Sequence, residues 1–260
     1  MTGSARPMNI LILGGTAEAR ALAAALAQRT VYAVTLSLAG RTAAHAPHSV
    51  PVRSGGFGGA EGLARYLRAE CIAALIDATH PYAAAISANA AQAARETGVP
   101  LLALLRPPWP KLPGDAWLEV ETVSDAVRAI GEIPRRVFLA LGRKELQSFE
   151  HAPHHSYLIR SVDPVDPPLA VPQASYIAAR GPFSAAEDRA LLEHYRIEIA
   201  VAKNSGGDAT YGKIAAARVL GLPVIMLQRP ALPPMESAAT VDEVLAWLDH
   251  ALTLSTARGV

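Results

Sequence analysis

Short apolar runs of strand length alternate with longer, alanine-rich segments of helical character along this chain. Strands alternating with helices are typical of parallel sheets covered by helices. The pattern therefore predicts an α/β protein with two Rossmann-like open parallel-sheet domains and the active site in the cleft between them. The predicted strands lie at residues 9–13, 31–38, 73–77, 101–105, 137–141, 157–161, 175–179, 199–202 and 223–228.

A proline-rich stretch separates the two sets of strands. Residues 106–114 read RPPWPKLPG, and four prolines in nine residues continue neither a helix nor a strand. The boundary placed here gives a first domain of residues 1–110 and a second of residues 111–260. A last helix is predicted at 241–252, and the pattern leaves open which domain it packs on.

Composition and charge favour a cytoplasmic enzyme. A net charge of +1 argues against a global attraction to nucleic acid or to membranes. The chain starts without the apolar stretch of a signal peptide, and no apolar run reaches the roughly 18 residues of a membrane helix. Cys71 has no cysteine to pair with and begins an apolar run, which predicts a core residue rather than a nucleophile.

The stretch MNILILGGTAEAR joins the first predicted strand to a helix through a glycine pair. Such a loop presents free backbone amides to a phosphate. A strict dinucleotide fingerprint has glycines at its first, third and sixth positions, which here are Gly14, Thr16 and Ala19. The stretch thus predicts either a nucleotide site or a plain glycine turn. The candidate cofactor-binding residues of this loop are Gly14, Gly15, Thr16, Ala17 and Glu18.

The end of the second predicted strand indicates which nicotinamide cofactor would bind. Enzymes that use NAD usually carry an acidic residue there, which holds the ribose hydroxyls. This chain has Ser37 and Arg41 in that region and no carboxylate. A guanidinium suits a 2′-phosphate, so NADPH is the predicted cofactor. The alternative for Arg41 is an ordinary solvated loop residue.

Residues 77–82, DATHPY, end a buried strand and open an almost uncharged helix, with Pro81 at its first position. Thr79 and His80 are candidate caps of that helix, and Thr79 also joins the cofactor site. His80 is equally a candidate proton donor. Asp77 is a candidate internal hydrogen-bond acceptor that fixes the loop.

Residues 203–213, KNSGGDATYGK, follow a predicted strand and form a second candidate anion site. The segment imitates a P-loop, but Ile214 stands where a magnesium-binding hydroxyl is needed. A helix predicted at 209–220 would also place Gly212 and Lys213 inside it rather than at its mouth. An NTP-dependent enzyme is therefore the less favoured alternative.

The sequence lacks the motifs of several other enzyme classes. No tyrosine has a lysine four residues later, and no G-x-S-x-G elbow is present. The histidine cluster HAPHH at 151–155 lies in a proline-containing loop without a nearby framework of cysteines or carboxylates, which predicts a solvated loop and no metal site.

Six segments taken in order resemble the precorrin-6A reductase family of cobalamin biosynthesis. They are LILGGTAEAR, DATHPYAAAISANA, LLRPPW, FLALGRKEL, GPFSAAED and VAKNSGGDATYGKIAAARVLGLPVIMLQRP. The resemblance implies an NADPH-dependent reduction of one ring double bond of precorrin-6A to give precorrin-6B, without metal or flavin. A variant of the family acts on the cobalt-containing intermediate, and no residue here separates the two substrates; the metal-free one is preferred. A non-catalytic nucleotide-sensing module is a further alternative.

The implied substrate is a polycarboxylate tetrapyrrole, which needs scattered cations around a broad apolar cleft. The candidate substrate-binding residues are Arg106, Arg143, Arg180, Lys203, Asn204, Ser205, Gly206, Gly207, Lys213 and Arg229. Arg160 is a further cation near a strand end.

The candidate proton donors are His80, Tyr82 and Tyr211, with solvent as the alternative. Transfer of intermediates to other enzymes of the pathway is left open.

Overall fold

The structure, a computed structural model, describes residues 7–40 and 48–257, with side chains as far as residue 251. The chain divides into two compact units. Unit 1 combines residues 1–106 with 231–260, and unit 2 is the continuous stretch 107–230. Both units are α/β, as predicted.

Unit 1 is built on a six-stranded sheet in the order β12-β5-β4-β1-β2-β3, with every neighbouring pair parallel. With its strands numbered along the chain, this is the 3-2-1-4-5-6 order of the dinucleotide-binding fold. The strands are β1 (Met8–Leu13), β2 (Tyr32–Leu38), β3 (Val52–Ser54), β4 (Ile72–Asp77), β5 (Leu101–Leu104) and β12 (Glu236–Ala238). The helices are α1 (Ala17–Ala27), α2 (Gly59–Ala69), α3 (Ala84–Thr97) and α8 (Val241–Ala257).

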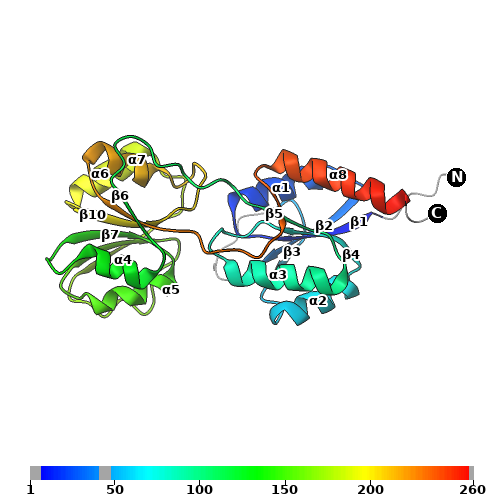
Figure 1. Cartoon of the computed structure of the whole chain (residues 1–260), viewed down its shortest axis with the longest axis horizontal. Coiled ribbons are helices and arrows are strands. Elements are labelled where there is room, and N and C mark those ends of the chain that lie inside the picture. Colours follow the sequence, from blue (N-terminus) through cyan, green and yellow to red (C-terminus); the bar gives the residue numbers. More distant parts are fainter. Residues whose placement is uncertain (1–6, 41–47, 258–260) are drawn as a thin grey trace. The chain divides into compact units, whose positions relative to one another are not determined.

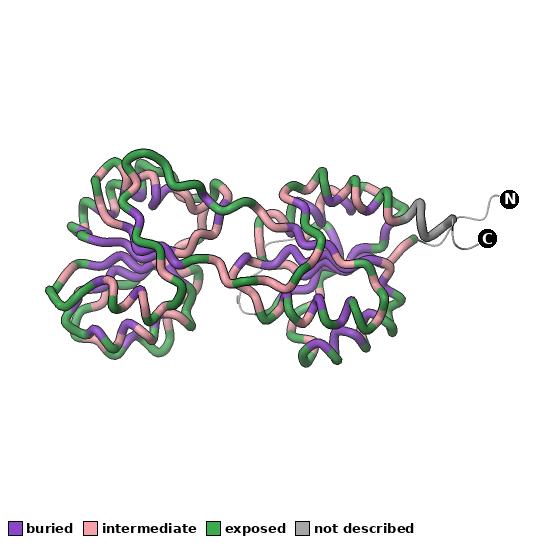
Figure 2. The backbone as a smooth tube through the Cα atoms, in the orientation of Figure 1, coloured by how far each residue is buried: buried purple, intermediate pink, exposed green. Residues whose placement is uncertain are grey.

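Helices cover both faces of this sheet, with α1 and α8 on one side and α2 and α3 on the other (Figure 1). Successive side chains of β1 point to opposite faces. Ile10 and Ile12 pack in the core under α1 and α8, whereas Leu11 and Leu13 pack under α2 and α3. Burial on both faces explains why residues 10–13 of β1 form an unbroken apolar run (Figure 2).

Unit 2 repeats this architecture with a parallel sheet in the order β6-β11-β10-β7-β8-β9. Helices α6 and α7 cover one face, and α4 and α5 lie on the other (Figure 1). The strands are β6 (Trp117–Val120), β7 (Arg136–Ala140), β8 (Ser156–Ser161), β9 (Ala174–Ala178), β10 (Ile199–Lys203) and β11 (Val224–Leu227). The helices are α4 (Val123–Ile130), α5 (Arg143–Leu146), η1 (Gln147–His151), α6 (Ala185–His194) and α7 (Gly212–Leu220).

The C-terminal segment differs most from the sequence-based expectation. The predicted second domain, 111–260, includes residues that the structure places in unit 1. β12 pairs with β5, and Val244 and Leu248 of α8 are fully buried in the core beside α1. The pattern missed β3 and β12 because three residues are too few to show a period, and it missed β6 because Glu119 interrupts its short apolar run.

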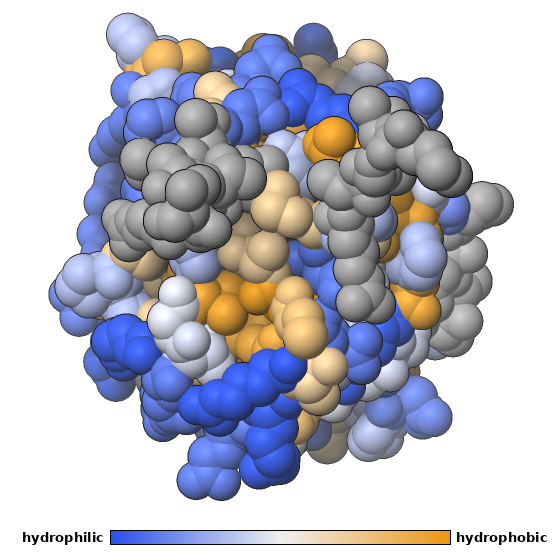
Figure 3. Space-filling model, turned by 90° about the vertical axis from the view of Figure 1, so that its right-hand side faces the viewer, coloured by the Kyte–Doolittle hydropathy of each residue, from blue (hydrophilic) through white to orange (hydrophobic). Residues whose placement is uncertain are grey.

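Cys71 is a second correction. Cys71 is exposed and has a φ of 47° in the turn between α2 and β4. The buried run begins one residue later, at Ile72, so the predicted core position is wrong. Among the described residues, no helix is long and apolar enough to cross a membrane. The face of unit 1 in Figure 3 is mostly hydrophilic around a smaller apolar area.

Candidate active site

The loop between β1 and α1 is shaped by two glycines and a threonine. A Cβ on Gly14 would come within 2.6 Å of Leu36 Cδ1. Gly15 has a φ of +122°, a backbone conformation that residues other than glycine rarely adopt. Thr16 caps α1, since its hydroxyl accepts a bond from the Ala19 amide at 3.0 Å. The same hydroxyl donates to the Ala78 carbonyl at 2.9 Å. Thr16 thus ties this loop to the loop after β4.

The loop after β4 is fixed by a buried carboxylate. Asp77 is 4% exposed and accepts bonds from the Thr79 amide at 3.1 Å and the Thr79 hydroxyl at 2.7 Å. His80 Nδ1 accepts a bond from the Tyr82 amide at 3.3 Å. The prediction that Thr79 or His80 caps the following helix is wrong, because α3 begins only at Ala84 and no side chain caps it. Thr79 and His80 instead hold the turn that precedes the helix.

Two candidate residues of unit 1 form an ion pair. Glu18, in the first turn of α1, lies 2.6 Å from Arg106, which follows β5. Both side chains are largely withdrawn from solvent, at 28% and 17% exposure. The sequence had placed Glu18 at the cofactor and Arg106 at the substrate, without indicating that they pair.

The end of β2 brings an unpredicted arginine to the candidate cofactor site. Ser37 is 5% exposed and lies beside Arg53 of β3 in the strand register. Arg53 Nη1 donates to the Ser37 hydroxyl at 3.2 Å. Arg41, the predicted reader of a 2′-phosphate, lies outside the described residues.

In unit 2, the loop after β10 is interlocked with the proline-rich stretch. The Asn204 amide side chain accepts from the Trp109 backbone amide at 2.7 Å and donates to the Trp109 carbonyl at 3.0 Å. The Trp109 indole donates to the Gly207 carbonyl at 2.7 Å. Arg229, after β11, donates to the carbonyls of Asn204 and Ser205 at 2.9 and 3.0 Å. Three segments distant in sequence therefore meet at one end of this sheet.

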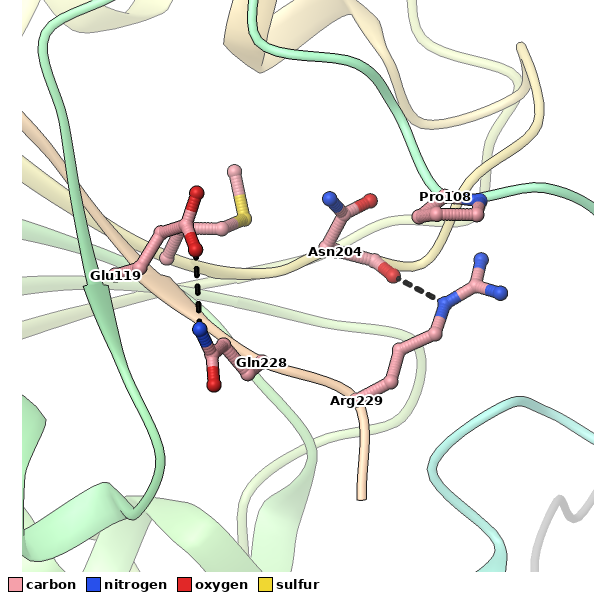
Figure 4. Close-up of a pocket in the computed structure, with 6 residues that line it drawn as sticks. Pro108, Glu119, Asn204, Gln228 and Arg229 are labelled. Carbon is pink, nitrogen blue, oxygen red and sulfur yellow. Dashed lines mark hydrogen bonds between the residues drawn. The ribbon is translucent and has the colours of Figure 1, made fainter. Parts of the chain in front are cut away.

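A small cavity of about 180 Å³ lies at this meeting point (Figure 4). Gln228 donates to Glu119 at 3.0 Å across it, and Arg229 reaches toward Asn204. Ligand pockets usually measure roughly 300–1,000 Å³. The cavity therefore has room for only part of a large ligand.

The other cations of unit 2 divide into paired and exposed ones. Lys203 forms an ion pair with Glu145 at 2.6 Å. Arg160, near the end of β8, is buried and pairs with Asp188, so its charge is withdrawn from solvent. Arg143 and Arg180 are exposed and pair with no carboxylate in the part of the chain that the structure describes.

Tyr211 and Lys213 lie beside the Trp109 ring. The rings of Tyr211 and Trp109 are 5.6 Å apart, and Arg218 donates to the Tyr211 hydroxyl. The pKa of Arg218 is raised, mainly by its hydrogen bond to Asp115 and to a smaller extent by its hydrogen bond to Tyr211. Lys213 is 5% exposed and donates to the Thr210 carbonyl at 2.6 Å.

The start of α7 corrects the P-loop argument. The helix begins at Gly212, not at 209, so Gly212 and Lys213 lie in its first turn. That objection to a P-loop is therefore wrong, because residues 209–211 form a turn instead of helix. Ile214 in place of a hydroxyl residue is the objection that stands.

The histidine segment is also less solvated than predicted. His155 is 1% exposed, and its Nδ1 accepts a bond from the Arg135 amide at 3.2 Å. Burial, followed by the charge of His154, lowers the pKa of His155. Across residues 7–40 and 48–251, no group of three or more His, Cys, Asp or Glu side chains is arranged to hold a metal.

The family model described as "Precorrin-6x reductase CbiJ/CobK" matches residues 9–249 of this chain. The chain belongs to the precorrin-6x reductase family. Among its relatives, the precorrin-6A reductase of Sinorhizobium sp. is 55% identical, over 96% of this chain and 95% of that protein. The precorrin-6A reductase of Rhodobacter capsulatus is 48% identical, over 96% and 99%.

The precorrin-6x reductase fold is likewise shared. A solved structure titled "CobK precorrin-6A reductase" matches with a TM-score of 0.90 and 46% identity, over 94% of this chain and 97% of that one. The cobalt-precorrin-6A reductase of Priestia megaterium is a more distant relative, 32% identical over 95% of this chain and 99% of that protein. The resemblance inferred from six motifs is confirmed.

Proposed function

We propose that this chain uses NADPH to reduce one ring double bond of precorrin-6A, giving precorrin-6B. The observation that carries the proposal is the 55% identity, over almost the full length of both proteins, to a relative named precorrin-6A reductase. The metal-free substrate is favoured because the relatives of that name are 43–55% identical to this chain. Those named cobalt-precorrin-6A reductase are only 28–32% identical.

The residues of unit 1 suit a dinucleotide phosphate. The amides at the start of α1 offer hydrogen bonds and the positive end of a helix dipole. A Cβ on Gly15 would meet nothing within 4 Å, so the space beside this residue is open. Gly14, Gly15, Thr16 and Ala17 would hold the phosphates, with Glu18, Ser37, Arg41 and Thr79 completing the site.

When bound, NADPH supplies the hydride that reduces the ring carbon. The protein's residues orient both partners, since the reacting carbons must approach to roughly 3–3.5 Å. His80, Tyr82, Tyr211 or solvent delivers the proton. Replacing the donor with phenylalanine should lower kcat by about 10²- to 10⁴-fold at unchanged KM. Full turnover in His80→Phe, Tyr82→Phe and Tyr211→Phe would leave solvent as the source.

The cations of unit 2 would bind the carboxylates of the macrocycle. Arg143 and Arg180 are exposed and without a carboxylate partner among the described residues, which leaves their charge available. Each change to glutamine should raise KM for the macrocycle about threefold to tenfold, because exposed charges are screened by solvent. Arg189→Gln, which removes an exposed arginine paired with Glu193, is the matched control. An unchanged KM in the double variant Arg143→Gln/Arg180→Gln would remove both residues from the site.

The deciding experiment supplies the purified protein with precorrin-6A and either NADPH or NADH, and follows nucleotide oxidation and the reduced macrocycle. We expect turnover with NADPH and a kcat/KM at least about tenfold lower with NADH, because a guanidinium gains its charge-assisted bonds only with the 2′-phosphate. A parallel assay with cobalt-precorrin-6A tests the alternative substrate. Binding of NADPH without oxidation by either macrocycle would support a nucleotide-sensing module instead.

The cytoplasmic location, the placement of the active site in a cleft between the two domains, and the transfer of intermediates to other enzymes stay predictions. Magnesium-dependent nucleotide binding that is lost in Lys213→Ala would favour the NTP-dependent alternative.

A further inference from the structure

Arg53 occupies a position where the adenosine half of a dinucleotide is recognised. It lies on β3, directly beside Ser37 in the register of the parallel β2–β3 pair. Ser37 is the next-to-last residue of β2. In a sheet with this strand order, the end of the second strand carries the residue that reads the 2′ position of the adenosine ribose. Arg53 therefore brings a guanidinium to the edge at which a 2′-phosphate would be distinguished from a hydroxyl.

Contacts on several sides hold the Arg53 guanidinium in place. Nη1 donates to the Ser37 hydroxyl at 3.2 Å and to the Gly55 carbonyl at 2.6 Å, and Nη2 donates to the Gly56 carbonyl at 2.8 Å. The group lies over the Phe57 ring, 3.7 Å from its centroid. A guanidinium carries five N–H donors, so these three bonds leave two for a ligand. A planar group fixed this way loses little freedom on binding a phosphate.

The charge of Arg53 has no carboxylate partner in the described parts of the chain. Its acceptors are a hydroxyl and two backbone carbonyls, which carry no net charge. Arg106, the arginine that follows β5 in the same unit, is instead paired with Glu18 at 2.6 Å. An anchored guanidinium that retains its charge is suited to a dianionic phosphate, because charge-assisted bonds of this kind are roughly twice as strong as neutral ones.

We propose that Arg53 binds the 2′-phosphate of NADPH and sets the preference of this enzyme for NADPH over NADH. The inference rests on the proposed function, because only a protein that uses NADPH has this phosphate to bind. A brace for the glycine-rich turn after β3 is the competing role of Arg53. The two roles differ in their readout: a brace affects every adenosine ligand, whereas a phosphate reader affects only those with a 2′-phosphate.

The test compares Arg53→Gln and Arg53→Lys with the wild-type protein by isothermal titration calorimetry. Two ligand pairs differ only in the 2′-phosphate: NADPH with NADH, and adenosine 2′,5′-bisphosphate with 5′-AMP. In Arg53→Gln we expect affinity for the phosphorylated member of each pair to fall about 10- to 100-fold, with affinity for the other member kept within about twofold. Arg53→Lys keeps the charge but not the fork of donors, so its loss should be smaller.

Arg68→Gln is the matched control. Arg68 is also an arginine of unit 1 that donates to a backbone carbonyl, that of Glu96 at 2.9 Å. It lies near the end of α2, just before β4 begins and so at the amino ends of the strands, and should leave all four affinities unchanged.

Three results would overturn the proposal. One is an equal loss for all four ligands in both Arg53 variants, which indicates a brace. Another is a selective loss in Arg41→Gln with none in Arg53→Gln, which assigns the phosphate to Arg41. The third is a wild-type protein that oxidises NADPH and NADH equally well. A wild-type protein that oxidises neither nucleotide with either macrocycle instead refutes the proposed function itself.

Discussion

Replacing Asp188 with leucine is expected to lower the free energy of unfolding by about 3–5 kcal/mol, because it strands a buried charge. The side chains of Asp188 on α6 and Arg160 on β8 are only 2% and 7% exposed and form an ion pair. The Arg160 guanidinium also lies 3.8 Å from the centre of the Phe183 ring. Without the carboxylate, this cation has no opposite charge to replace its lost hydration. Urea denaturation followed by tryptophan fluorescence measures the loss.

Two further variants make this result specific. Glu193→Gln removes a carboxylate from the same helix, but its ion pair with Arg189 is about half exposed and should be worth less than about 1 kcal/mol. Arg160→Met combined with Asp188→Leu removes both charges and should recover most of the stability that Asp188→Leu loses. A double variant as unstable as Asp188→Leu alone would show that packing, and not the stranded charge, causes the loss.

Gly206→Ala is expected to have the largest effect on the loop after β10. A Cβ there would come within 2.1 Å of the Pro107 carbonyl, and the residue has a φ of +68°. Backbone has to move, so we expect a loss of stability of about 2–4 kcal/mol, from overpacking and backbone strain together. The proposed substrate residues Asn204 and Ser205 move with it. A kcat/KM for precorrin-6A at least about tenfold lower should accompany the loss.

Gly221→Ala separates the two contributions. Gly221 ends α7 with a φ of +64°, but a Cβ there would meet nothing within 4 Å. Its substitution should cost only the strain of about 1–2 kcal/mol and leave kcat/KM unchanged. Steady-state kinetics and urea denaturation of the two variants provide the comparison. Equal effects on stability would mean that the contact with Pro107 relaxes without cost.

The sequence predicts long, doubly buried strands well and short ones poorly. β1 and β4 are apolar at every position except Asn9 and Asp77, because helices cover both faces of the sheet, and this leaves a clear signal. β3 and β12 have three residues each, too few for a period. The return of the C-terminal segment to unit 1 depends on the pairing of β12 with β5, which no local pattern encodes.

The candidate site follows the same rule. The glycine loop and the end of β4 could be proposed from the sequence because turn residues and polar residues after buried strands are local signals. The partners of these residues were not found, since Glu18 and Arg106 lie 88 positions apart in the chain. Arg53 was missed because it lies on a three-residue strand that the pattern did not reveal. Ser37 became its neighbour only through the register of β2 and β3.

The late position of β12 in the chain bears on how the protein is made. Unit 2 is one uninterrupted stretch, residues 107–230, and all its strands are synthesised before residue 236 is added. Synthesis of unit 1 starts before that of unit 2, yet its sheet lacks an edge strand and its core lacks Val244 and Leu248 until all of unit 2 has been made. Of the two units, the one that is begun first is therefore the last to be completed.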